Sequence, residues 1–257
     1  MTRITPKQGS VILTGAGSGL GRAMAAELTG RGFTTFGLGR RAEALEQTRA
    51  LCDGGRFVPM AVDVADGDAV KAAVDGIERD HGPVAVLINN AAVYPRVDFL
   101  EASAQDFMSV VAVNLGGVVH CSHAVLRHMA ARGSGRILTV ATFADLNPLP
   151  TAGAYSVSKG AARILTRALI ADLCDRFPGI VIGDWMPGML KTDMGIPDGL
   201  DPAVSAKWGV ALALTADPAL TGAVFERNIE ILPPTGLKGK LKAALTGKRR
   251  KPRVIEI

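Results

Sequence analysis

The sequence has few cysteines and few aromatic residues. Only three cysteines occur among 257 residues, namely Cys52, Cys121 and Cys174. Their odd number and wide spacing fit neither a disulfide framework nor a Cys-x-x-Cys metal site. We therefore expect reduced thiols and a cytoplasmic protein. Aromatic residues make up 5% of the chain and include two tyrosines. A motif built on tyrosine is thus informative in this sequence.

Long apolar runs are also missing. No stretch of 18 or more apolar residues occurs, so the sequence predicts no membrane-spanning helix. The first ten residues are polar and lack the apolar centre of a signal peptide. Hydrophobic residues nevertheless form 48% of the chain, which is enough to build one sizeable core. Charged residues form 21%, which argues against disorder of the whole chain.

Basic residues are concentrated at the C-terminus. Residues 238–257 contain eight Lys or Arg and one Glu. Their net charge of +7 (8 − 1) exceeds the net charge of +5 for the whole chain. The remainder is close to neutral, and we expect no nucleic-acid partner. We divide the chain into a domain at 1–237 and a basic tail at 238–257. Leucines at helical spacing within this tail would allow contact with an anionic membrane or an acidic carrier protein, and the alternative that we favour is a solvated helix with a frayed end.

Short apolar runs alternate with helical stretches along the chain. This order is typical of a parallel sheet that is covered by helices on both faces. We predict a single-domain α/β fold, a Rossmann-type doubly wound parallel sheet of about seven strands. The stretch 186–203, rich in Gly, Pro and Asp, is predicted to be a long loop or lid. The predicted strands are 10–14, 33–38, 57–61, 84–88, 137–140, 180–185 and 223–226, and the predicted helices are 19–30, 41–52, 67–80, 104–131, 152–176 and 202–215.

A glycine-rich loop follows the first predicted strand. Its glycines are Gly15, Gly17, Gly19 and Gly21, and Leu20 occupies the place of the last glycine in a strict G-x-G-x-x-G pattern. Glycines allow the backbone to approach a pyrophosphate, and the following helix offers free N–H groups and the positive end of its dipole. Such a loop is also compatible with a purely structural turn, so its meaning depends on the other motifs.

The second predicted strand is followed by two arginines, Arg40 and Arg41. A cofactor with a free ribose 2′-hydroxyl is usually met by a carboxylate at this place. Guanidinium groups suit a 2′-phosphate instead. We therefore predict NADP(H) rather than NAD(H), mainly through Arg40, with the Ser18 hydroxyl as a second donor. The alternative is a pair of solvated residues that open a helix.

Tyr155 and Lys159 are four residues apart, which places them on one face of a helix. Reduction of a ketone needs a proton donor, and oxidation of an alcohol needs a base. A free phenol has a pKa of about 10 and is a poor base at pH 7. A nearby ammonium group favours the phenolate and lowers that pKa. The pair thus predicts proton transfer at Tyr155.

Several motifs, in the same order, resemble those of the short-chain dehydrogenase/reductase family over about residues 8–228. They are TGxxxGxG at 14–21, Asp63-Val64 after the third strand, an NNAA turn at 89–92, Asn114, YxxxK at 155–159 and PGxxxT at 187–192. The resemblance implies a cofactor site made of Gly15, Ser18, Gly19, Leu20, Gly21, Arg40, Arg41, Asp63, Val64, Asn90, Ala91, Tyr155, Lys159, Pro187, Gly188, Leu190 and Thr192.

The resemblance also implies catalytic roles. Tyr155 would be the general acid in reduction and the base in oxidation. Lys159 would lower the pKa of Tyr155 and bind the nicotinamide ribose, and Asn114 would hold a water that connects Lys159 to solvent. Hydride would pass directly between nicotinamide and substrate carbon, so no metal is expected. The family's catalytic Ser is here Thr142, which keeps the hydroxyl but adds a methyl group that narrows the pocket or lowers the rate.

The sequence therefore predicts an NADP(H)-dependent oxidoreductase that interconverts a carbonyl and a secondary alcohol, with reduction favoured. The near-neutral body and the apolar residues around 186–203 suggest an apolar substrate. Tyr94, Asp145 and Met189 occupy positions where the family places substrate-facing residues. We expect a homodimer or a homotetramer, and the helices at 104–131 and 152–176 could support the dimer. The alternative is a non-catalytic NADP(H)-binding sensor or scaffold protein, for which the exchange to Thr142 leaves room.

Overall fold

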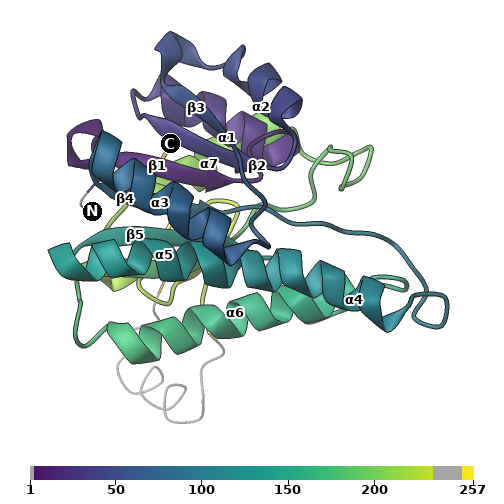
Figure 1. Cartoon of the computed structure of the whole chain (residues 1–257). Helices are drawn as coiled ribbons and strands as arrows, with labels where there is room; N and C mark the ends of the chain where they lie inside the picture. Colours follow the sequence, from purple (N-terminus) through teal and green to yellow (C-terminus); the bar gives the residue numbers. More distant parts are fainter. Residues whose placement is uncertain (1–2, 234–250) are drawn as a thin grey trace, which may run out of the picture.

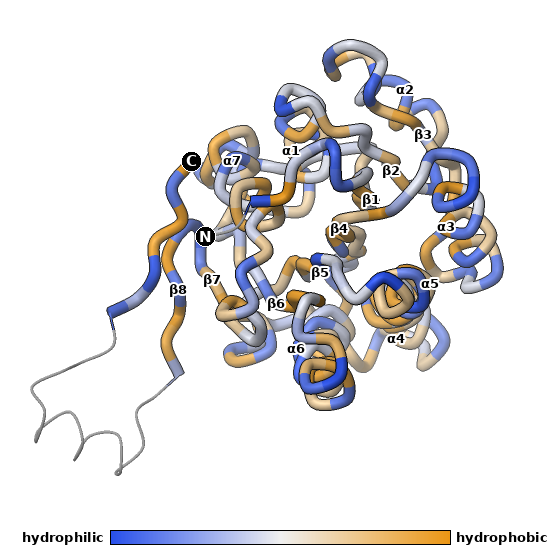
Figure 2. Tube along the Cα trace, turned by 90° about the vertical axis from the view of Figure 1, so that its left-hand side faces the viewer, coloured by the Kyte–Doolittle hydropathy of each residue, from blue (hydrophilic) through white to orange (hydrophobic). Residues whose placement is uncertain are grey.

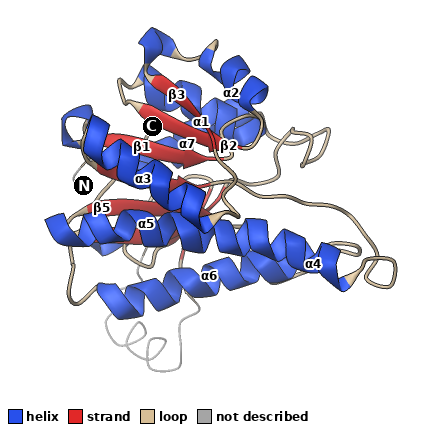
Figure 3. Ribbon diagram, viewed as in Figure 1, coloured by secondary structure: helices blue, strands red, loops and turns tan. Residues whose placement is uncertain are grey.

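A computed structural model describes residues 3–233 and 251–257 and shows one sheet between two layers of helices (Figures 1 and 3). The strands lie in the order β3-β2-β1-β4-β5-β6-β7-β8, and only β8 runs antiparallel to its neighbour within these residues. This confirms the predicted Rossmann-type fold. The strands are β1 (Ser10–Thr14), β2 (Thr35–Gly39), β3 (Phe57–Ala61), β4 (Val84–Asn89), β5 (Gly135–Val140), β6 (Ile180–Met186), β7 (Val224–Glu226) and β8 (Ile229–Ile231).

The helices divide between the two faces of the sheet, and each face carries its own apolar core (Figure 2). One core joins the sheet to α1 and α7, for example through Met24, Leu28 and Val210. The other joins it to α3 and α5, for example through Val74 and Val125. The helices are α1 (Gly19–Gly30), α2 (Ala42–Arg49), α3 (Gly67–His81), α4 (Ala104–Val111), α5 (Gly117–Arg132), α6 (Gly153–Leu173) and α7 (Pro202–Ala213).

The helix predicted over 104–131 is interrupted. A π-helical turn at Ala112–Gly116 separates α4 from α5. Hydrophobic periodicity did not reveal this turn, because apolar residues occur on nearly every side of the segment and hide the change of phase that one extra residue causes. The whole segment Ala104–Arg132 is long and apolar enough to cross a membrane, since an 18-residue window within it has a mean hydropathy of 1.5. In the fold, α5 packs against β4 and α3, so its apolar face belongs to the protein core.

The C-terminal edge of the sheet has an eighth strand, whereas the sequence predicted about seven. β8 is only three residues long and has one buried residue, so its apolar pattern is too short to recognise. Residues 251–257, which the sequence placed in the basic tail, continue this edge. Val254 forms an antiparallel bridge with Ile229, and Ile255 is buried in the core. The remainder of the predicted tail, 238–250, lies outside the described residues.

The seven parallel strands end at one edge of the sheet, and the predicted motifs lie there. β1 has β2 on one side and β4 on the other, so the chain order changes direction at this strand. In open α/β sheets, ligands bind at such a switch point, beyond the carboxyl ends of the strands. The loops after the first six strands, β1 to β6, therefore form the candidate site.

Candidate active site

The glycine-rich loop lies tightly against the loop after β4. Gly15 has a φ of 67°, and a Cβ atom there would lie 2.8 Å from the Cα atom of Ala91. A Cβ atom on Gly21 would lie 2.1 Å from the carbonyl oxygen of Gly15. A side chain at Gly15 would push this loop away from the loop after β4, and one at Gly21 would push α1 away from the end of β1. Close approach of these elements thus requires glycine at both positions.

Hydrogen bonds fix the relative position of these two loops. The backbone N–H groups of Asn90 and Ala91 donate to Oγ1 of Thr14, each at 2.9 Å. The Asn90 side-chain amide donates to the carbonyl oxygen of Thr14, also at 2.9 Å. Predicted cofactor residues from β1 and β4 are therefore held together before any ligand binds.

The N-terminus of α1 fits a phosphate group. Ser18 occupies the N-cap position, and its side chain does not cap the helix. The first N–H groups of the helix are therefore available to an anion and are supported by the helix dipole. Leu20 is buried beneath this end, and the Thr192 methyl carbon lies 3.3 Å from the place where a Cβ atom on Gly19 would be. The segment after β6 thus reaches the glycine-rich loop.

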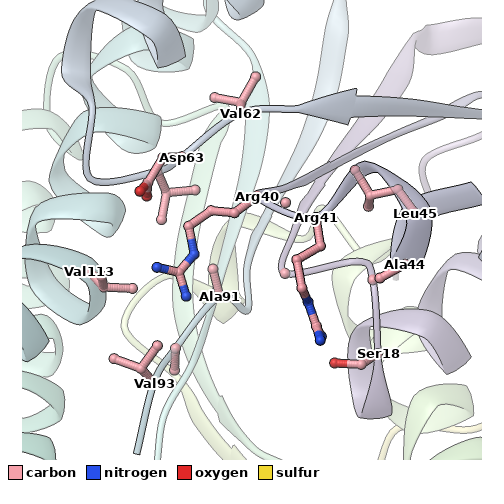
Figure 4. A pocket seen from close by; sticks show the side chains of 15 residues that line it. Ser18, Arg40, Arg41, Ala44, Leu45, Val62, Asp63, Ala91, Val93 and Val113 are labelled. Carbon is pink, nitrogen blue, oxygen red and sulfur yellow. The ribbon is translucent and has the colours of Figure 1, made fainter.

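A cavity beside the glycine-rich loop collects most of the other predicted cofactor residues (Figure 4). Arg40 and Arg41 are both exposed, and neither makes a side-chain hydrogen bond or ion pair with the described residues. Figure 4 shows Arg41 extending toward Ser18, whereas Arg40 extends past Ala91. Two unpaired guanidinium groups in one cavity suit an anionic group such as a 2′-phosphate. The cavity is lined by Gly15, Gly17, Ser18, Gly39, Arg40, Arg41, Ala44, Leu45, Val62, Asp63, Val64, Ala91, Ala92, Val93 and Val113.

The loop after β3 forms the opposite wall of this cavity. The Asp63 carboxylate accepts a hydrogen bond from the Ala65 N–H at 3.0 Å and shapes the turn. Nδ1 of His120 lies 2.9 Å from the carbonyl oxygen of Val64. A Cβ atom on Gly117 would lie 2.7 Å from a Val64 methyl carbon, so α5 packs closely against this wall.

Lys159 is almost fully buried next to Tyr155 on the first turns of α6. Its ammonium group donates a hydrogen bond to the carbonyl oxygen of Val140 at 2.8 Å, and the residue is 3% exposed. Burial lowers the pKa of Lys159 to about 8, and the Asp184 carboxylate opposes this shift. The lysine therefore stays mostly protonated at pH 7 and points toward the end of β5.

Two other side chains with hydroxyl groups, Thr142 and Tyr94, lie near Tyr155. Burial raises the pKa of Tyr155, the Thr142 hydroxyl lowers it, and the Tyr94 phenol raises it. Thr142 follows β5, and its Oγ1 also accepts a hydrogen bond from the Ala144 N–H at 3.2 Å. The structure thus brings the predicted residues Tyr155, Lys159 and Thr142 together, and it keeps Tyr155 as a neutral phenol able to donate a proton.

Asn114 lies in the π-helical turn and is completely buried. Its Oδ1 accepts from the Val93 N–H at 2.8 Å, and its Nδ2 donates to the Val93 carbonyl oxygen and to Oγ of Ser158, each at 3.0 Å. Ser158 in turn donates to the carbonyl oxygen of Tyr155 at 2.9 Å. Asn114 therefore ties the loop after β4 to α6. The sequence analysis did not single out Ser158, although its place directly before Lys159 could have indicated it.

The segment after β6 contains the remaining predicted residues, Pro187, Gly188, Leu190 and Thr192. Gly188 has a φ of 87°, and the Arg227 side chain lies where a Cβ atom would project, 3.2 Å away. Leu190 is buried and bridges to Leu200, which closes the predicted loop. No regular helix or strand occurs between β6 and α7, as the sequence predicted.

Two buried charges beneath the site were missed by the sequence analysis. Asp184 on β6 accepts a hydrogen bond from Oγ1 of Thr166 at 2.7 Å, and burial raises its pKa to about 6. Arg136 on β5 is 1% exposed, and burial lowers its pKa to about 10, against the effect of Asp184. A charged residue inside an otherwise apolar strand was the available signal. Next to them, Trp185 is fully buried, so it belongs to the core.

Possible metal ligands do not gather at this site. Among the described residues, no group of three or more His, Cys, Asp or Glu could hold a metal ion. The side chains that do gather here, namely a phenol, a buried ammonium group, a hydroxyl and unpaired guanidinium groups, suit a phosphorylated organic cofactor.

Comparison with known proteins shows which family the chain resembles. The model of short chain dehydrogenases matches residues 10–201. Gluconate 5-dehydrogenase of Gluconobacter oxydans is 33% identical over 185 residues, which cover 71% of this chain and 72% of the relative. Meso-2,3-butanediol dehydrogenase of Serratia marcescens is 31% identical over 217 residues, which cover 84% of each chain.

The fold has close counterparts among solved structures. A gluconate 5-dehydrogenase from Burkholderia cenocepacia, in complex with NADP and tartrate, aligns with a TM-score of 0.77 and 26% identity and covers 87% of this chain and 94% of its own. A short chain dehydrogenase from Bacillus anthracis aligns with a TM-score of 0.79 at 23% identity and supports the fold alone. The family model covers most of the chain, and the relatives match it at both sequence and structural level: the protein belongs to the short-chain dehydrogenase family.

Proposed function

We propose that this protein transfers a hydride between NADP(H) and a carbonyl or secondary alcohol substrate, with Tyr155 as the general acid and base. The observation that carries this proposal is the meeting of the Tyr155 phenol, the Thr142 hydroxyl and the buried Lys159 ammonium group beside the cofactor cavity. Membership of a dehydrogenase family supports the same class of reaction.

The bound nicotinamide would supply or accept the hydride. In the reducing direction, the Tyr155 hydroxyl donates its proton to the substrate oxygen, and the Thr142 hydroxyl donates a second hydrogen bond to the same atom. The phenol is well suited to this role because burial keeps it protonated at neutral pH. In the oxidising direction the same oxygen of Tyr155 takes the proton back, which requires the phenolate.

Lys159 makes that phenolate accessible. Its ammonium group is fixed by the hydrogen bond to Val140 and carries a positive charge at pH 7, since its pKa is about 8. In a dry site a fixed charge interacts more strongly with a developing anion than it would in water. Asp184 helps to keep the lysine charged. Asn114 positions α6, and with it Tyr155, through Ser158.

The choice of NADP(H) rests on Arg40 and Arg41, which are unpaired within the described residues and line the cofactor cavity. A related gluconate 5-dehydrogenase was solved with NADP, which supports this choice.

Arg40→Asp is expected to reverse the cofactor preference toward NADH, because it removes a hydrogen-bond donor to the phosphate and adds a carboxylate for the ribose hydroxyl. The measurement is the ratio of kcat/KM for NADPH and NADH. Arg41→Asp is the matched variant, and the arginine whose loss changes the ratio more is the main phosphate contact. An unchanged ratio in both variants would contradict the assignment.

The substrate meets apolar side chains on the loops after β5 and β6. Phe143, Met189 and Met194 are exposed there, which supports the predicted apolar body of the substrate. The relatives act, by name, on a sugar acid and on a diol, so they leave the polar part of the substrate open. We expect these three side chains to contact the carbon chain of the substrate.

A screen of ketones, aldehydes and secondary alcohols with both cofactors tests the proposed function. We expect reduction of at least one carbonyl class with NADPH, followed as loss of nicotinamide absorbance, and a higher kcat/KM with NADPH than with NADH. Tight NADPH binding without turnover of any compound would favour the alternative, a sensor or scaffold protein. Absence of both binding and turnover would contradict both readings.

We further propose a homodimer or homotetramer in the cytoplasm. Exposed apolar residues on α4, α5 and α6 support an interface there, namely Met108, Val119, Val157 and Ile164. α4 packs beside α6, so these residues belong to neighbouring helices. The proposed contact of the basic tail with an anionic surface involves mainly residues outside the described part of the chain.

A further inference from the structure

An arginine lies beside the candidate catalytic tyrosine through one intervening ring. Tyr94, in the loop after β4, has its ring centroid 4.4 Å from that of Tyr155, with the ring planes tilted by 33°. The guanidinium carbon of Arg96 lies over the Tyr94 ring, 5.4 Å from its centroid. The distance from the guanidinium carbon of Arg96 to the centroid of the Tyr155 ring can therefore not exceed the sum of these two distances. A permanent positive charge is therefore within reach of a small substrate bound at Tyr155.

The loop that carries Arg96 is held at both ends. On one side, Val93 is bound through its N–H and carbonyl groups to Asn114. On the other side, the Val97 N–H donates to the carbonyl oxygen of Thr151 at 3.1 Å. Pro95 further restricts the backbone between these anchors. The cation–π contact then restrains the arginine side chain itself.

The guanidinium group of Arg96 has no polar partner. The residue is exposed, and within the described part of the chain it makes neither a hydrogen bond nor an ion pair. The carboxylate two residues further along the chain, that of Asp98, accepts a hydrogen bond from the Leu100 N–H at 2.9 Å and forms no ion pair with Arg96 among the described residues. All five N–H donors of Arg96 therefore remain available to a ligand.

We propose that Arg96 binds a carboxylate on the substrate, so that the preferred substrates are oxo acids and the corresponding hydroxy acids. This inference rests on the proposed function, because it places the reacting carbonyl at Tyr155. The planar guanidinium fork matches a carboxylate through two parallel hydrogen bonds. The apolar residues Phe143 and Met189 then contact the carbon chain between the two ends. The enzyme selects a substrate that is charged at one end and reacts at the other.

Matched pairs of substrates and variants test this proposal. The substrates are 4-oxopentanoate, 5-oxohexanoate and 6-oxoheptanoate, each compared with its neutral amide. The variant is Arg96→Gln. Its control is Arg176→Gln, because Arg176 lies over the Phe177 ring at the same distance of 5.4 Å but beyond the C-terminal end of α6, away from Tyr155. The measured quantity is kcat/KM with NADPH for every combination.

In the native protein, we expect the best acid to exceed its amide in kcat/KM by about tenfold or more, mainly through KM. Arg96→Gln is expected to remove this preference by lowering the value for the acid, whereas the amide changes little. Arg176→Gln is expected to leave both values as they are. Added salt should weaken the preference for the acid, because an exposed charge is screened.

Three outcomes would overturn the proposal. The first is that the native protein has the same kcat/KM for an acid and its amide. The second is that Arg96→Gln lowers kcat/KM for acids and amides by the same factor. The third is that Arg176→Gln removes the preference for the acid as much as Arg96→Gln does. In each of these cases turnover itself continues, so the proposed function stands. If no carbonyl is turned over, the proposed function fails. Calorimetric binding of 4-oxopentanoate and its amide to the NADPH complexes of the native protein and Arg96→Gln then decides the role of Arg96: loss of acid binding alone supports it, and any other pattern refutes it.

Discussion

Tyr155→Phe is expected to lower the turnover of every carbonyl substrate by about a hundredfold to ten-thousandfold, the usual contribution of a positioned general acid. The substitution removes the proton donor and keeps the ring. The Tyr94 ring, 4.4 Å away, can still stack on the phenylalanine, so the shape of the site should be preserved. The measurement is steady-state kcat with saturating NADPH, together with NADPH binding by fluorescence. We expect binding to be retained.

Tyr94→Phe is the matched variant, because the chain contains only two tyrosines. The substitution removes the Tyr94 hydroxyl, whose presence raises the pKa of Tyr155. It leaves the stacked pair of rings in place. Most of the turnover should survive this change. Full activity in Tyr155→Phe, or a larger loss in Tyr94→Phe than in Tyr155→Phe, would show that the proton comes from another group.

The second large effect concerns stability and the buried charges Arg136 and Asp184. Asp184→Asn is expected to lower the free energy of unfolding by about 1–3 kcal/mol, because it removes the buried negative charge that favours the charged Arg136 guanidinium inside the sheet. The asparagine oxygen still accepts from Thr166, so the change is mainly one of charge. Arg136→Met should cost less. The remaining carboxyl can take up a proton, whereas a guanidinium group cannot lose one.

This difference predicts a dependence on pH. Burial raises the pKa of Asp184 from 3.8 to about 6, so in this range the folded protein binds a proton that the unfolded chain has released. Stability from this group is present at low pH and is lost as pH rises through about 6. The loss should be somewhat larger in Arg136→Met, because Arg136 is one of three arginines, after Arg163 and Arg167, whose charges lower this pKa. Urea unfolding at about pH 4.5 and about pH 8 measures it.

The double variant Arg136→Met/Asp184→Asn supplies the control for both single variants. It removes both charges and should recover most of the stability lost in Asp184→Asn, with little dependence on pH between the two conditions. Additive losses in the double variant would mean that the two residues do not compensate each other. A loss in Arg136→Met as large as that in Asp184→Asn would contradict the protonation argument.

Local sequence patterns predicted much of the fold because they reflect local physics. The strands at 10–14 and 57–61 were predicted with the bounds that the structure has, since turn residues flank short apolar runs. β8 was missed because a three-residue strand at the edge of a sheet buries too few side chains to leave a pattern. The same reason applies to residues 251–257, where Ile255 alone enters the core.

The candidate site shows the same division between local and distant information. Tyr155 and Lys159 could be recognised because both lie on one helix at a fixed spacing. The ring contact of Tyr155 with Tyr94, and the electrostatic effect of Asp184 on Lys159, join elements that are far apart in the sequence. No spacing rule encodes such pairs, because the sheet order brings them together. The stack that includes Arg96 therefore became visible only in three dimensions.

The π-helical turn at Ala112–Gly116 also has a consequence for how such a site arises in evolution. A turn of this kind holds one residue more than the α-helix around it. Loss of a single codon there would leave an unbroken helix from α4 to α5 and rotate one end against the other by about 100°. Asn114 would then turn away from Val93 and Ser158, although the sheet and both cores could stay intact. The extra residue of this turn is therefore what directs the Asn114 side chain inward.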